Sequence, residues 1–183
     1  MKFTEGYWLP SEKANASHAM QAYEVEQIPG GMRILATTRP IEHRGMTLNL
    51  PTITVEFDTI SMEAWHYEAY DNKVPSFDKT ESVYEDVTVT INDDEAVLDT
   101  GSVLVRVQRK GIFAYTFEAD GKVLTGSGFR NLSYIRWDRK QSTMLPAPNY
   151  MTEKYQPYMV SELSLGVGEC VYGLGERFTP FVK

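Results

Sequence analysis

Three groups of residues in this sequence have side chains or spacing that could do chemistry: one cysteine, three histidines and a glycine-spaced run near the C-terminus. Cys170 is the only thiol, and a reactive thiol needs an accessible, electropositive setting. It lies instead in a strand-like apolar run, Glu169-Cys170-Val171-Tyr172, where a free cysteine usually packs as a small hydrophobic side chain. The sequence therefore predicts a buried, unreactive Cys170, and a single cysteine allows no internal disulfide.

The histidines His18, His43 and His66 are not at the spacing of metal ligands, and Cys170 is far from each of them. The acidic run Asp93-Asp94-Glu95 is typical of a solvated turn. We therefore expect no metal site and no cofactor.

The glycines of Gly173-Leu174-Gly175 resemble a phosphate-binding loop only superficially, because neither a GxGxxG nor a Walker spacing opens a helix here. Glycines that alternate with large residues at a strand end more often allow a bulge or close backbone packing. We expect this structural role.

Aromatic residues make up 12% of the chain. Trp8, Trp65 and Trp137 could form a platform for sugars, since aromatic faces stack on apolar sugar faces. In a β-sandwich, however, most aromatic side chains serve the core, and we expect that role for the majority.

The net charge of −7 argues against nucleic acid as a partner, because phosphate binding needs a basic face. No stretch approaches the ~18 consecutive apolar residues of a membrane span. The first residues have neither an apolar run nor a cleavage site, so they do not resemble a signal peptide. The simplest expectation is a soluble cytoplasmic protein without nucleic acid or membrane partners.

The segments expected to position these residues have apolar side chains at every second position. Apolar residues alternate in Thr52–Phe57, in Val87–Ile91 and in Val103–Val107, which indicates half-buried strands. Turn residues separate such runs at Pro29-Gly30-Gly31, at Asn92-Asp93-Asp94 and at Asp120-Gly121, where both residues tolerate a positive φ. We count ten to twelve short strands, which predicts an all-β fold, a large antiparallel β-sandwich.

Some segments depart from this period. Ser11 to Met20 could hold one short helical turn, and Trp65–Tyr70 is predicted as a strand. The polar, proline-bearing run from Asp138 to Asn149 is predicted as a long loop. After it, Tyr158, Val160, Leu163 and Leu165 predict a further strand region with an irregular phase.

The run from Leu165 to Phe178 resembles the GE-x-x-YGLGERF segment of family 31 glycoside hydrolases, and most closely their bacterial α-xylosidase branch. Other stretches agree in order: Phe3 to Leu9 is similar to the family's opening F-x-x-G-x-W, and Arg44 to Pro51 to its RG-x-TLN-x-P connection. Phe113 to Thr125 resembles the hairpin that carries DGK-x-LT. The resemblance covers essentially the whole chain.

This resemblance implies that residues 1–183 form a single N-terminal β-sandwich domain of the galactose-mutarotase-like (supersandwich) type, truncated before a catalytic (β/α)₈ barrel. The family's retaining mechanism uses two aspartates on the barrel, and retaining enzymes hold two carboxyl groups ~5 Å apart. No position of this sequence matches them, so the resemblance implies no catalytic residue here.

The resemblance also implies a site of contact with the barrel, formed by the family's signature residues Tyr172, Gly173, Gly175, Glu176, Arg177 and Phe178. Glu176 and Arg177 would form an interdomain ion pair or hold the start of the barrel; alternatively, they are ordinary strand-end residues. An exposed interdomain face would also favour self-association.

The functional expectation is therefore a non-catalytic domain of a retaining α-glycosidase that hydrolyses terminal α-linked xylose or glucose from oligosaccharides. The domain would pack on the barrel and help shape substrate access. The alternative is a free-standing carbohydrate-binding β-sandwich. An aldose epimerase of the same sandwich type is a further alternative, and it would need a histidine acid with a carboxylate base.

Overall fold

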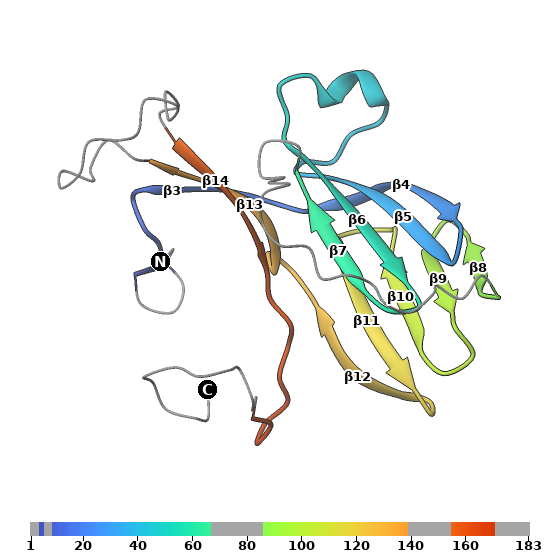
Figure 1. Cartoon of the computed structure of the whole chain (residues 1–183). Helices are drawn as coiled ribbons and strands as arrows, with labels where there is room; N and C mark the ends of the chain where they lie inside the picture. Colours follow the sequence, from blue (N-terminus) through green and yellow to red (C-terminus); the bar gives the residue numbers. More distant parts are fainter. Residues whose placement is uncertain (1–3, 6–8, 67–85, 139–154, 171–183) are drawn as a thin grey trace.

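The computed structural model of the chain describes residues 4–5, 9–66, 86–138 and 155–170 (Figure 1). Within these residues there are fourteen β-strands and one short 3₁₀ helix, η1 (Arg44–Thr47). All strand pairs are antiparallel, which confirms the predicted all-β class. The count exceeds the predicted ten to twelve because β1 (Thr4–Glu5) and β2 (Leu9–Pro10) are too short to show a period.

The first large sheet has four strands in the order β4-β5-β6-β7. The alternation predicted for Thr52–Phe57 is confirmed, since Ile53, Val55 and Phe57 are buried on one face of β6. The predicted turn at Pro29-Gly30 joins the first two strands of this sheet. The strands are β4 (Gln21–Ile28), β5 (Gly31–Thr37), β6 (Thr52–Asp58) and β7 (Met62–Trp65).

The second large sheet has five strands in the order β12-β11-β10-β9-β8. Its last hairpin turns at Asp120 and Gly121, whose φ angles of 51° and 70° match the predicted two-residue turn. Val105 and Val107 of β10 are buried, as their alternation predicts. The strands are β8 (Thr88–Ile91), β9 (Glu95–Asp99), β10 (Leu104–Gln108), β11 (Ala114–Ala119) and β12 (Lys122–Ser127).

The two large sheets pack face to face and enclose one apolar core (Figure 1). Phe57 of β6 contacts the rings of Tyr115 and Phe117 of β11 edge-on, with centroids 5.2 Å and 6.0 Å apart. Side chains of both inner faces thus interdigitate as in a sandwich. The predicted β-sandwich is confirmed.

A smaller sheet, in the order β14-β13-β3, extends the core at one end. Leu132 and Tyr134 of β13 are buried and belong to the same apolar cluster as the two large sheets. Its strands are β3 (Ala14–His18), β13 (Leu132–Asp138) and β14 (Tyr155–Ser161).

Two local predictions differ from the structure. The short helical turn within Ser11–Met20 is wrong, because Ala14–His18 forms β3 and pairs with β13. The strand expected over Trp65–Tyr70 begins earlier, at Met62, and ends at Trp65; residues 67–70 lie outside the described part. The first difference arises from pairing with a distant strand, which overrides local propensity, and the second from the hairpin that β7 forms with β6.

The structure from Asp138 onward agrees only partly with the loop and strand predicted there from the sequence. Tyr158 and Val160 lie in β14, whereas Leu163 and Leu165 follow its end and are exposed. Of the predicted loop from Asp138 to Asn149, Asp138 ends β13 and the other residues lie outside the described part.

Candidate functional site

The predicted interdomain residues Tyr172, Gly173, Gly175, Glu176, Arg177 and Phe178 all lie outside the described residues. Their placement remains a prediction. The described chain that leads to them, residues 162–170, has left the sheet after β14 and turns at Val167 and Gly168, where Gly168 has a φ of 86°.

Cys170 is exposed, so the prediction of a buried cysteine is wrong. The apolar pattern around it suggested a strand, but residues 162–170 form no strand in the structure. Without a sheet on which to pack, the thiol faces solvent.

The histidines lie on separate elements, as their spacing predicts. His18 is on β3, His43 precedes η1, and His66 follows β7. Among the described residues, no group of three His, Cys, Asp or Glu side chains is close enough to hold a metal ion.

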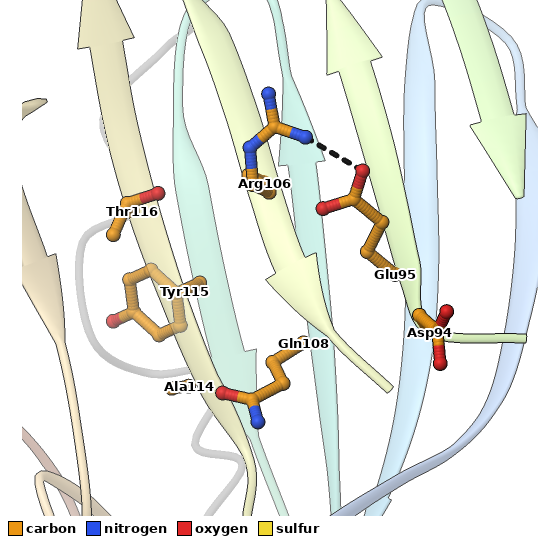
Figure 2. A pocket seen from close by; sticks show the side chains of 7 residues that line it. All are labelled: Asp94, Glu95, Arg106, Gln108, Ala114, Tyr115 and Thr116. Atoms are coloured by element: carbon orange, nitrogen blue, oxygen red, sulfur yellow. Dashed lines mark hydrogen bonds and ion pairs between the residues drawn. The ribbon is translucent and has the colours of Figure 1, made fainter. Parts of the chain in front are cut away.

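The second large sheet has a hollow of ≈ 250 Å³ on its outer face (Figure 2). It is open to solvent and crosses β9, β10 and β11, where the side chains alternate away from the core. The lining residues are Asp94, Glu95, Arg106, Gln108, Ala114, Tyr115 and Thr116.

Arg106 lines this hollow, and its hydrogen bonds join three strands. Its Nη1 donates to Glu95 Oε1 at 2.7 Å, and its Nε donates to Glu118 Oε1 at 3.3 Å. Thr116 Oγ1 donates to the same oxygen of Glu118 at 3.0 Å. Each partner faces Arg106 because the antiparallel register places outward-pointing residues of β9 and β11 beside those of β10.

These contacts keep both kinds of charge in their ionised forms. The hydrogen bonds that Arg106 donates, first to Glu95 and then to Glu118, raise the pKa of Arg106. The hydrogen bond from Thr116, followed by that from Arg106, lowers the pKa of Glu118. A general acid needs the opposite, a carboxyl group whose pKa is raised toward neutrality. Glu118 is therefore suited to holding the sheet's outer face in place and not to acting as a general acid.

A second hollow, of ≈ 630 Å³, lies beside the connection between η1 and β6. His66 lines it and is only 2% exposed, with its ring stacked on Tyr134 at 3.9 Å between centroids. Arg136 also lines it, and its guanidinium lies over the rings of Tyr134 and Tyr155. The full lining is Thr47, Leu48, Asn49, Leu50, Pro51, Thr52, His66 and Arg136.

This second hollow lacks the groups for sugar chemistry among the described residues that line it. A retaining glycosidase needs two carboxyl groups, and an epimerase needs a carboxylate beside its histidine. Its described lining contains one imidazole and one guanidinium but no carboxylate. Neither chemistry follows from this geometry.

Four of the described aromatic side chains are buried in the core, and most of the others are half-buried. Phe57, Phe113 and Tyr115 are each at most 2% exposed. Trp65 and Trp137 are half-buried and lie on different sheets, and Trp8 is outside the described residues. Trp65 and Trp137 therefore do not share one sheet.

No helix in the described part of the chain is long and apolar enough to cross a membrane. The feature that the sequence analysis did not predict is the ion-pair network of Arg106 with Glu95 and Glu118. The signal was present in the spacing of Glu95, Arg106 and Glu118, which two tight hairpins bring side by side.

Comparison with known proteins identifies the class to which this sandwich belongs. Residues 52–183 match the sequence profile of the glycosyl hydrolase 31 N-terminal galactose mutarotase-like domain, and the chain belongs to that family. It is similar over its whole length to "Alpha-xylosidase XylQ" of Lactiplantibacillus pentosus, with 31% identity over 188 residues. It is also similar to "Alpha-xylosidase" of Emericella nidulans, with 29% identity over 195 residues. The chain spans 23% and 25% of these two relatives, about a quarter of their length.

Proposed function

We propose that this chain is the non-catalytic N-terminal β-sandwich of a retaining α-glycosidase of the α-xylosidase type. The observation that carries the proposal is the family match together with two relatives named as α-xylosidases, of which the chain spans about a quarter. The longer protein would hydrolyse terminal α-linked xylose or glucose from oligosaccharides, and it would act in the cytoplasm.

The catalytic carboxyl groups would lie outside this chain. A retaining mechanism requires a nucleophile and an acid/base about 5 Å apart beside the scissile bond. In the described hollows, the carboxylate of Glu95 is ion-paired to Arg106, and the hollow beside His66 has no carboxylate in its described lining. Under this proposal, the domain supports a catalytic barrel without contributing the reacting groups.

The domain would pack on the barrel and help shape substrate access. Under this proposal, Tyr172 to Phe178 lies at the junction, where Glu176 and Arg177 form an interdomain ion pair or hold the start of the barrel. Free-standing carbohydrate binding is the weaker proposal, because the family match and both named relatives point to a domain of a larger glycosidase.

An activity comparison tests the proposal. This chain and the longer polypeptide encoded by the same gene are assayed with p-nitrophenyl α-xyloside and p-nitrophenyl α-glucoside. We expect turnover by the longer polypeptide and none by the chain alone. Turnover by the chain that survives removal of contaminating enzymes would contradict a non-catalytic role, and an inactive longer polypeptide would contradict the glycosidase assignment.

A further inference from the structure

Six large apolar side chains are exposed on β12, in the loop after β12 and in the chain after β14. Each of the six is at least 51% exposed, which is unusual for large hydrophobic residues so close together. We call this surface the apolar border. Its residues are Val123, Leu124, Phe129, Leu163, Leu165 and Val167.

Backbone hydrogen bonds bring the two halves of the apolar border side by side. The Ser164 N–H donates to the Gly126 carbonyl at 2.8 Å, and Thr125 Oγ1 donates to the Ser164 carbonyl at 2.8 Å. The Glu162 N–H donates to the Asn131 carbonyl at 2.7 Å. Residues 162–164 therefore run antiparallel to residues 126–131, where the chain after β14 passes β12 in Figure 1. The segments that carry the six side chains therefore lie next to each other.

The outer faces of the two large sheets have a different character. On the first, Arg33 bridges Glu26 and Glu56 across three strands. On the second, Arg106 bridges Glu95 and Glu118. Faces with such ion pairs are suited to water, whereas an apolar surface is stabilised by being covered.

The apolar border also has the polar rim that is typical of an interaction surface. Lys122, Arg130 and Glu162 are exposed around it. The guanidinium of Arg130 lies over the Phe129 ring, 4.8 Å from its centroid. An apolar centre with charged residues at its edge is the arrangement found where proteins or domains meet.

We propose that the apolar border is the surface on which the rest of the longer polypeptide packs. This inference rests on the proposed function. The relatives are about four times longer than this chain, so a domain large enough to cover the border is expected. Half of the border lies on residues 163–167, and chain that continues from there is tethered beside it. Tethering gives a high effective concentration, which a second copy in solution does not have.

Hydrogen exchange compares the border in the two contexts. The chain alone and the longer polypeptide are labelled in parallel, and the peptides covering residues 122–129 and 162–168 are followed. We expect exchange in the longer polypeptide to be slower by about tenfold or more, which corresponds to ~1.4 kcal/mol of added local protection. Peptides from β8, at the far edge of the same sheet, serve as the reference.

A pair of matched variants assigns the protection to the border. Leu165→Asp places a charge on the border, and Ile91→Asp places one on β8, where Ile91 is 40% exposed. In the longer polypeptide, Leu165→Asp should abolish most of the added protection and Ile91→Asp should retain it. In the chain alone, Leu165→Asp should leave exchange unchanged, because Leu165 is exposed there.

The outcomes separate this inference from the function on which it rests. Equal exchange of the border in both contexts, with an active longer polypeptide, would overturn the inference and leave the glycosidase assignment intact. Protection that appears in the chain alone and rises with its concentration would assign the border to a second copy and would also overturn it. A longer polypeptide without glycosidase activity would contradict the proposed function, while added protection of its border would still support the packing surface.

Discussion

Phe57 of β6 and Tyr115 of β11 meet edge-to-face across the sandwich, with ring centroids 5.2 Å apart and planes at 68°. The Tyr115 hydroxyl also lies 3.4 Å from Ser161 Oγ, at the end of β14. Tyr115 therefore links both large sheets to the smaller one, and the pair with Phe57 lies at the centre of the buried cluster.

The first prediction concerns the stability of this core. Phe57→Ala should lower the free energy of unfolding by ~3–5 kcal/mol, because it removes a buried ring and leaves a cavity. Phe129→Ala is the matched control, since Phe129 is 51% exposed, and it should change stability by about 0.5 kcal/mol or less. Urea unfolding of the chain measures both. Equal losses would contradict the assignment of Phe57 to the core. If Phe57→Ala does not fold, Phe57→Leu should show a smaller loss in the same direction.

Much of this core could be predicted from the sequence because its information is local. The alternation of Ile53, Val55 and Phe57 specifies which face of β6 is buried, whatever strand pairs with it. The pairing of β3 with β13 could not be predicted, because more than a hundred residues separate Ala14–His18 from its partner and no local pattern encodes that contact.

Less of the candidate site than of the core could be predicted from the sequence. Tyr172 to Phe178 was identified by resemblance and lies outside the described residues, so the structure does not test its role. The exposure of Cys170 and Leu165 was not predicted, because an apolar pattern indicates that residues will be covered without indicating by what.

The second prediction concerns the turn between β11 and β12. Gly121 has a φ of 70°, in the left-handed region that costs other residues roughly 1–2 kcal/mol. Gly121→Ala should therefore destabilise the chain by about 1 kcal/mol. Gly128→Ala is the control, since a Cβ there would meet nothing within 4 Å and its φ is outside that region; it should be neutral or slightly stabilising. Thermal unfolding of both variants measures the difference, and an equal effect would contradict the turn geometry.

The third prediction concerns the ion pairs around Arg106. Glu118→Gln should lower the free energy of unfolding by about 0.2–1 kcal/mol at low salt, because it weakens a partly exposed ion pair. The loss should shrink toward zero at about 1 M salt, where the Debye length is ~3 Å. Glu42→Gln, at an exposed glutamate before η1, is the control and should show no such salt dependence. A loss from Glu118→Gln that is the same at all salt concentrations would indicate packing instead of charge.

The fourth prediction concerns pH. Burial lowers the pKa of His18 below its ordinary value of 6.5, and the nearby charge of Arg130 acts in the same direction. The hydrogen bond to the Arg130 carbonyl and the charge of Glu162 oppose this shift without cancelling it. The unfolded chain therefore binds a proton at a higher pH than the folded chain. The stability that neutral His18 contributes is fully present above about pH 6.5, the pKa of the unfolded chain. This contribution is lost as the pH falls from there to the lowered pKa of the folded chain. His18→Gln should flatten the decline in unfolding free energy between about pH 7 and pH 5. The pKa of Glu118 is lowered from 4.5, so its own contribution disappears only at more acidic pH. Urea unfolding at a series of pH values measures the slope, and a variant with the wild-type slope would show that His18 does not cause the decline.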